Sequence, residues 1–195
     1  MRPFQSGDLN DLFAYMSRPE VVRYLYGDVK DGAEAQELLV RWMAGSSMTQ
    51  AGERLVLAVT PRGGGRVMGE VMLMWRSQEH QQAELGYVFH PDFHGQGFAA
   101  EAARAMLGLG FQEFGFHRIY ARCDARNTAS YKVMERLGMR REAHFIHNEL
   151  FKGEWSDELQ YAILQTEWAA LAVTRQYDTP ILGHKPLGTR PHKKK

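Results

Sequence analysis

The chain has 195 residues, a formal net charge of +1 at pH 7 and 44% hydrophobic residues, a composition typical of one globular domain with its own core. It has no apolar run long enough to span a membrane and no N-terminal signal sequence, so we expect a cytoplasmic protein with no membrane partner. The single cysteine, Cys123, excludes an internal disulfide, and the eight histidines lack metal-ligand spacing, so we expect no metal site.

The positive charge is concentrated at the C-terminal end of the chain. Residues 184–195 contain five lysines and arginines and no acid, which leaves a net charge of −4 for residues 1–183. With Pro186, Pro191 and the glycines Gly183 and Gly188, this composition predicts a basic, disordered tail over 177–195, after a domain of residues 1–176. Such a tail suits contact with RNA or a ribosome, although solvated termini of this kind are common.

Two helices and three strands are predicted in the first half of the chain. Apolar residues at helical spacing predict helices over 6–17 and Gly32–Ala44, with a short turn over 20–26 between them. The apolar pattern then changes to that of strands, which we place at Arg54–Thr60, Arg66–Trp75 and Glu84–Phe89. Short turns join these strands, so we expect them to be antiparallel neighbours.

The second half alternates between helices and strands. A helix is predicted from Gly97 to about Phe114, with an apolar stripe formed by Phe98, Ala102, Ala105 and Leu109. The later elements are a strand at Arg118–Asp124, a helix at Asn127–Leu137, a hairpin of His144–Phe151 and Glu158–Leu164, and a last helix at Gln165–Gln176. This order predicts a mixed α/β (α+β) domain on one mostly antiparallel sheet flanked by helices, rather than a regular βαβ series.

The most distinctive segment joins the third strand to the next helix and reads His94-Gly95-Gln96-Gly97-Phe98-Ala99. Its glycines allow a sharp turn and a close approach of the backbone to a ligand. The helix that follows presents free N–H groups and the positive end of its dipole. A strand, a glycine turn and a helix N-terminus in succession are typical of a phosphate or pyrophosphate site.

Gly95-Gln96-Gly97-Phe98-Ala99-Ala100 also matches the dinucleotide fingerprint G-x-G-x-x-G/A, with Asp124 as a ribose-binding acid, and this would indicate an NAD(P)-binding protein. The position of the motif, behind antiparallel strands and without further βα units, disfavours that interpretation.

A second candidate binding segment begins the next helix. Asn127, Ser130 and Met134 are spaced so that they share one helix face. The first two side chains could form hydrogen bonds with an extended ligand that passes the helix N-terminus. The alternative for Asn127 is that it only caps the helix.

Together these motifs resemble the GNAT superfamily of acetyl-CoA-dependent N-acetyltransferases, and in particular its RimJ/RimL-like branch. The resemblance covers roughly residues 1–170 in element order. Residues 83–88 resemble the family's splayed central strand, 94–99 its pyrophosphate loop, 127–139 its second cofactor helix and 148–158 its closing hairpin. It implies a single GNAT-like domain that transfers an acetyl group directly to a primary amine, without a covalent enzyme intermediate.

The resemblance also implies roles for individual residues. The backbone amides of Val88, Phe89 and His90 would polarise the thioester carbonyl. The pyrophosphate would be held by His94, Gly95, Gln96, Gly97, Phe98 and Ala99. Asn127 would bind the pantetheine arm and Ser130 would stabilise or protonate the leaving thiolate. Glu84 is the first candidate for the general base, acting through water, and Glu149, His144 and His147 are its rivals. Cys123 is expected to be an inert core residue.

Two residues depart from the family's pattern. His94 stands where the loop usually begins with Arg or Gln, and Met134 stands where many relatives have a tyrosine general acid. The expected partners are acetyl-CoA and an amine, carried by a ribosomal protein, a peptide or a small molecule, and a homodimer is left open. A different class of function is a non-catalytic sensor that binds acyl-CoA and does not depend on Glu84 or Ser130.

Overall fold

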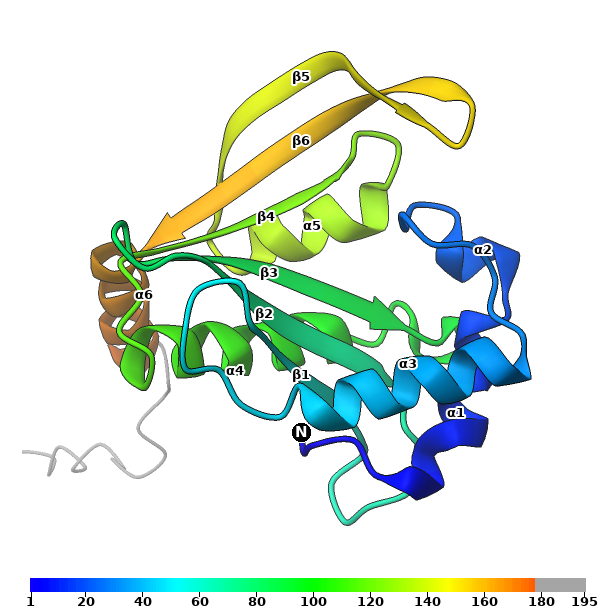
Figure 1. Ribbon diagram of the computed structural model, residues 1–195. Helices are drawn as coiled ribbons and strands as arrows, with labels where there is room; N and C mark the ends of the chain where they lie inside the picture. The colour runs from blue at the N-terminus through cyan, green and yellow to red at the C-terminus, as the bar shows by residue number, and fades with distance from the viewer. Residues whose placement is uncertain (178–195) are drawn as a thin grey trace, which may run out of the picture.

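The computed structural model describes residues 1–177, so the predicted basic tail from residue 178 onwards lies outside the described residues. The fold is built on one six-stranded sheet in the order β1-β2-β3-β4-β6-β5 (Figure 1). Its strands are β1 (Arg54–Val59), β2 (Gly69–Ser77), β3 (Gln82–Phe89), β4 (Arg118–Asp124), β5 (Arg140–Phe151) and β6 (Glu154–Leu164).

One pair of strands departs from the antiparallel pattern. β3 and β4 run parallel, and they pair only where Gln82–Glu84 lie opposite Arg118–Tyr120. Beyond Glu84 the two strands diverge, as Figure 1 shows. We call the opening between them the wedge. It leaves the edge of β3 without strand partners over its second half, in the middle of an otherwise continuous sheet.

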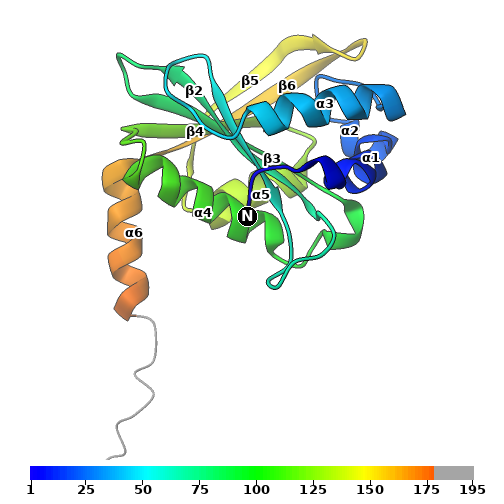
Figure 2. The same cartoon turned by 60° about the horizontal axis from the view of Figure 1, so that its bottom comes forward.

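Helices cover both faces of the sheet (Figure 2). The N-terminal helices are η1 (Ser6–Asp8), α1 (Leu9–Met16), α2 (Pro19–Val22) and α3 (Gly32–Ala44), and the later ones are η2 (Pro91–Phe93), α4 (Phe98–Gln112), α5 (Thr128–Arg136) and α6 (Gln165–Tyr177). None of the helices in the described part of the chain is long and apolar enough to cross a membrane.

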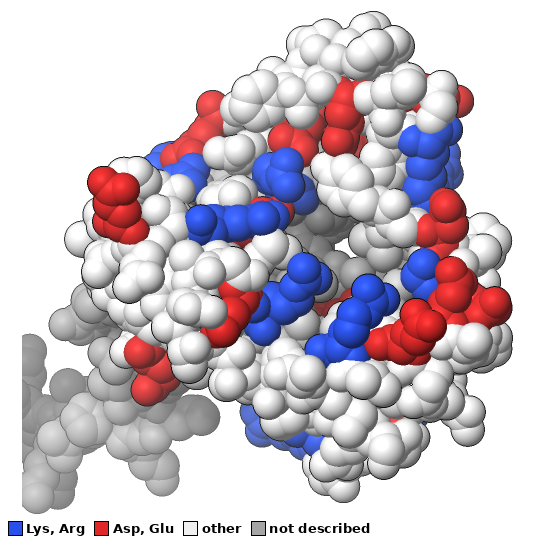
Figure 3. Space-filling view, viewed as in Figure 1, with Lys and Arg blue, Asp and Glu red and all other residues white. Residues whose placement is uncertain are grey.

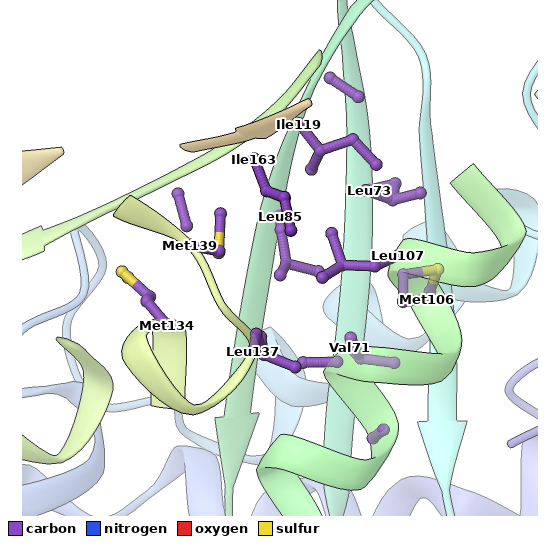
Figure 4. Close-up of a cluster of buried hydrophobic side chains, with 14 of the residues drawn as sticks. Val71, Leu73, Leu85, Met106, Leu107, Ile119, Met134, Leu137, Met139 and Ile163 are labelled. Atoms are coloured by element: carbon purple, nitrogen blue, oxygen red, sulfur yellow. The ribbon is translucent and has the colours of Figure 1, made fainter. Parts of the chain in front are cut away.

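Two hydrophobic clusters follow from the alternation of side chains along the strands. Val71 and Leu73 of β2 pack with α4 and α5 in the larger cluster, which Figure 4 shows in close-up. Val56 and Ala58 of β1 pack with α1 and α3 in the smaller one. The sheet is therefore buried on both faces near its centre, and this rigid layer carries the wedge.

The predicted order of helices and strands is confirmed except for α2 (Pro19–Val22), which forms where a short turn over 20–26 was predicted, and three further details differ. β2 begins at Gly69 rather than Arg66, because the Val67 amide donates to Asp11 Oδ2 (2.7 Å) and holds the preceding residues in a loop. The closing hairpin is longer than predicted, since its turn consists of Lys152 and Gly153 alone, both with positive φ (49° and 86°).

The apolar stripe of α4 is the third difference. The helix buries Ala102, Ala103, Met106, Leu107, Gly110 and Phe111. Ala105, which we placed on the buried stripe, is exposed, and Phe98 and Leu109 are only partly buried. Both stripes are apolar at helical spacing, so only the position of α4 on the sheet decides between them.

Candidate functional site

A pocket of about 430 Å³ opens at the wedge and contains residues of both predicted binding segments. Its walls come from the end of β3, the loop before α4, the first turns of α4 and α5, and the segment around α2. In the space-filling view this face of the molecule is hollowed at its centre, with basic and acidic side chains around the rim (Figure 3). A second hollow of about 320 Å³ beside Gly45 and Glu53 contains no residue of either segment.

The loop before α4 presents uncapped amides to this pocket. Gly95 (φ 74°) and Gly97 (φ 88°) both adopt left-handed backbone, which glycine tolerates best. No side chain in the described residues caps α4, and the first bond within the helix runs from the Glu101 amide to the Gly97 carbonyl (3.0 Å). The amides of Phe98 and Ala99 are therefore free at the positive end of the helix dipole, which is an anion site.

The side chains of the loop hold its shape. His94 Nε2 lies 2.9 Å from the carbonyl oxygen of Phe89, and because a carbonyl only accepts, this nitrogen donates. Gln96 Nε2 donates to the carbonyl of Asp92 (2.8 Å). Both side chains are thus engaged with the backbone, so the amides of the loop and helix, rather than these side chains, face an anion.

The structure narrows the choice among the three predicted β3 amides. The His90 amide donates to Met68 O (2.8 Å) on the β2 side, so it is not free, and this corrects our expectation for that residue. Hydrogen-bonded pairs alternate along an antiparallel ladder, so the Val88 amide, opposite Glu70, also points toward β2. Phe89 lies between Val88 and His90 in the chain, so its amide points the other way, into the wedge.

The start of α5 forms the opposite wall. Asn127 Oδ1 caps the helix by accepting a hydrogen bond from the Ser130 amide (3.2 Å), which is the capping role given above as the alternative for this residue. Both residues also line the pocket, and the side-chain nitrogen Nδ2 of Asn127, which makes no hydrogen bond among the described residues, is available to a ligand. The Tyr87 hydroxyl lies 2.8 Å from the Ser130 carbonyl oxygen and 3.2 Å from its Oγ.

Two basic residues of this wall were missed in the sequence. Lys132 and Arg136 line the pocket one turn apart on α5. They carry positive charge toward a phosphorylated ligand. The i, i+4 spacing of two basic residues was the available signal, but on an isolated helix the same spacing describes an ordinary solvated face.

Glu84 lies at the vertex of the wedge, in the last β3–β4 pair, and is held by two arginines. Arg76 Nη2 lies 2.6 Å from Glu84 Oε2, and Arg122 Nε lies 3.2 Å from Oε1. Arg122 also pairs with Glu158 (3.0 Å), whose pKa is raised by burial. This ion chain crosses β2, β3, β4 and β6, and it was invisible in the sequence because its members are far apart along the chain.

Neither Glu84 nor its rivals Glu149, His144 and His147 are among the residues that line the pocket. Glu149 accepts from the Tyr26 hydroxyl (3.0 Å), whereas His144 Nε2 and the His147 amide both contact Asp157 (2.8 and 2.9 Å). Burial raises the pKa of Cys123 to about 11, so its thiol keeps its proton at neutral pH. Among the described residues, no group of three or more His, Cys, Asp or Glu side chains could hold a metal ion.

A family model described as an acetyltransferase (GNAT) domain matches residues 1–140. The chain belongs to the GNAT acetyltransferase family. It is 33% identical over 168 residues to the uncharacterized N-acetyltransferase YnaD of Bacillus subtilis, a match that covers 86% of this chain and 94% of that protein.

Solved GNAT structures superpose over most of the chain. A GNAT-family acetyltransferase from Bacillus anthracis is 34% identical with a TM-score of 0.76, and the match covers 85% of this chain and 94% of that one. Spermidine N-acetyltransferase from Vibrio cholerae, solved in complex with CoA and spermine, is 21% identical with a TM-score of 0.72, over 86% of this chain and 96% of that one. At 21% identity, the match to the Vibrio cholerae enzyme shows a shared fold.

Membership of the GNAT family confirms the expected single-domain fold, with its mostly antiparallel mixed sheet, and the expected enzyme class. The dinucleotide interpretation of the glycine motif is wrong. That fold needs a parallel sheet, and β3–β4 is the one parallel pair among the described strands. The matching family is described only at the level of the GNAT domain, which does not distinguish the RimJ/RimL-like branch from others.

Proposed function

We propose that this GNAT protein transfers an acetyl group from acetyl-CoA directly to a primary amine. The observation that carries the proposal is that one pocket brings together the uncapped α4 amides, the Phe89 amide and the start of α5. The fold neighbour from Vibrio cholerae was solved with CoA, which supports the same co-substrate here.

The residues present fit an elongated, phosphorylated thioester. The α4 amides suit its pyrophosphate, and Lys132 and Arg136 suit the remaining negative charge. Asn127 can donate to an amide oxygen of the pantetheine arm. The Phe89 amide, which faces the wedge, suits the thioester carbonyl.

The reaction converts an ammonium ion and a thioester into an amide, a thiol and one free proton. The amine must lose a proton before it attacks, and we assign that step to Glu84 through a water molecule. The Phe89 N–H stabilises the negative charge that develops on the carbonyl oxygen. When the C–S bond breaks, its electron pair stays on sulfur, and the Ser130 hydroxyl donates a hydrogen bond to it. One of the two protons lost by the nitrogen completes the thiol.

The acceptor is proposed at the level of a primary amine. The resemblance to the RimJ/RimL-like branch favours a protein N-terminus or a ribosomal protein, whereas the neighbour solved with spermine favours a polyamine. Glu84, Glu149 and Glu158 lie on three different strands but close enough to interact electrostatically, and Arg122 offsets part of their charge. A homodimer remains a prediction.

Calorimetric titration with acetyl-CoA, with NADH as the control, tests the proposal first. We expect a micromolar dissociation constant for acetyl-CoA alone, which corresponds to a binding free energy on the order of −8 kcal/mol. A screen of peptides, ribosomal proteins and polyamines by release of free thiol then identifies the acceptor. Binding without turnover on any amine would favour the non-catalytic sensor, and absence of binding would refute the proposal.

A further inference from the structure

Tyr87 connects the two walls of the wedge through its hydroxyl group. The residue lies on β3, beyond the last β3–β4 pair at Glu84, and its side chain reaches the first turn of α5. The two contact residues, Tyr87 and Ser130, are 43 positions apart in the chain. The contact therefore joins strands and helices that the diverging sheet no longer holds together.

The two distances assign the hydrogens of this contact. A phenol carries one hydrogen, and the shorter contact, 2.8 Å to the Ser130 carbonyl oxygen, takes it. The phenol oxygen is then left as an acceptor for the Ser130 hydroxyl at 3.2 Å. Burial raises the pKa of Tyr87 far above neutrality, so the phenol stays protonated and this arrangement persists across the physiological pH range.

Ser130 is consequently fixed at its carbonyl and hydroxyl by Tyr87, and at its amide by Asn127. A hydroxyl that is held in this way costs little to reorganise during reaction. When negative charge develops on a sulfur in the pocket, the serine hydrogen can turn from the phenol oxygen, which is a weak acceptor, to the stronger one.

We propose that Tyr87 is a positioning residue for acetyl transfer, which holds the Ser130 hydroxyl ready to donate to the sulfur that leaves when the C–S bond breaks. This inference rests on the proposed function. It adds a residue that acts through Ser130 and not by contact with the cofactor. It requires no proton transfer from the phenol.

The test is Tyr87→Phe, which removes the hydroxyl and keeps the ring. We expect kcat to fall roughly tenfold, because the Ser130 hydroxyl is no longer held in place and its hydrogen bond to the sulfur is weaker in the transition state. The dissociation constant for acetyl-CoA should stay close to that of the wild type, whereas the melting temperature should fall by about a few degrees because the two contacts of the Tyr87 hydroxyl are lost. The matched control is Tyr131→Phe, since Tyr131 is the next residue on α5, packs against the core and contacts no polar group through its hydroxyl in the described structure.

A double-mutant cycle decides whether Tyr87 acts through Ser130. The double variant Tyr87→Phe/Ser130→Ala should be no slower than Ser130→Ala alone. Additive losses, an unchanged kcat in Tyr87→Phe, or a loss of acetyl-CoA binding equal to the loss of rate would each overturn the inference. If the wild type neither binds nor uses acetyl-CoA, the proposed function fails instead, so the two failures are distinguishable.

Discussion

Single residues of this protein take their properties from partners on other strands. Glu84 has two guanidinium partners, yet Arg122 is shared with Glu158 and can stay with that carboxylate when Glu84 takes up a proton. Glu70 has the opposite environment, because it is 1% exposed and its polar partner among the described residues is the neutral Tyr15 hydroxyl. The two carboxyls therefore make separate predictions, one for catalysis and one for stability.

The first prediction is that Glu84→Gln lowers kcat by about a hundredfold or more while acetyl-CoA binding is kept, since the change removes the carboxylate that we propose as the base and keeps the shape of the side chain. The rate of thiol release and a calorimetric titration measure the two quantities. Glu37→Gln, an exposed change on α3, is the control. A kcat within about threefold of the wild type would move the base to Glu149 or a histidine.

The second prediction concerns Glu70 and pH. Burial raises the pKa of Glu70 to about 8 from an ordinary value of 4.5. Below pH 4.5 the Glu70 carboxyl is protonated in both the folded and the unfolded protein, so the buried side chain carries no charge and no penalty for ionisation. As pH rises from 4.5 through 8, the carboxyl ionises first in the unfolded chain, so the free energy of unfolding declines, by on the order of 5 kcal/mol in full.

Glu70→Gln should remove this decline, because an amide does not titrate. Denaturant unfolding of both proteins at pH 5, 7 and 9 measures it, and the difference between them isolates Glu70 from the histidines. Parallel pH profiles for the two proteins would contradict the prediction.

At the scale of elements, the site depends on how α4 lies against the sheet. Gly110 is buried at this contact, where an added Cβ would lie 2.6 Å from Ile119 Cδ1 and 3.0 Å from Leu73 Cδ1. An added Cβ at Gly108, on the same helix, would meet nothing within 4 Å. The close approach of α4 to the sheet thus depends on Gly110 and not on Gly108.

The third prediction is that Gly110→Ala destabilises the fold by about 1–3 kcal/mol through overpacking. Gly108→Ala is the matched control, and it should stabilise the fold by up to about 1 kcal/mol because alanine is the better helix former. Denaturant unfolding of the two variants measures both effects. Equal stabilisation by both changes would show that α4 can shift away from the sheet without cost.

For the whole molecule, the N-terminal segment and the closing hairpin meet across the open side of the wedge, as Figure 1 shows near α2. Lys152 Nζ donates to the carbonyls of Val22 and Gly27 (both 3.0 Å), and Tyr26 packs edge-on against Phe151. These contacts join segments more than 120 residues apart. If the amine acceptor of the proposed function enters from this side, loss of the contacts should weaken its binding.

The fourth prediction is that Lys152→Met raises the KM for the amine several-fold and leaves acetyl-CoA binding within about twofold. The change keeps the apolar stem and removes two hydrogen bonds and an ion pair to Asp28 (3.3 Å), so stability should fall by about 1–2 kcal/mol. Hydrogen exchange should become faster in the β5–β6 hairpin. Lys30→Met, which removes only a long ion pair to Glu34 (3.8 Å), is the control, and equal effects of the two changes would contradict the prediction.

The sequence by itself determined the kinds and order of the elements, the glycine loop and the cap at Asn127. Each of these depends on the conformational preferences of a few neighbouring residues, which act before any tertiary contact forms. The resemblance to the GNAT family could also be read from two such local motifs.

Only the tertiary structure decided which stripe of α4 is buried, that the His90 amide is occupied, and that Glu84 is held by Arg76 and Arg122. It alone brought Tyr87 to Ser130. These contacts join residues from different elements, and their existence depends on strand register and helix position. A side chain's partners are set by where the whole sheet places it, and no local pattern along the chain encodes that placement.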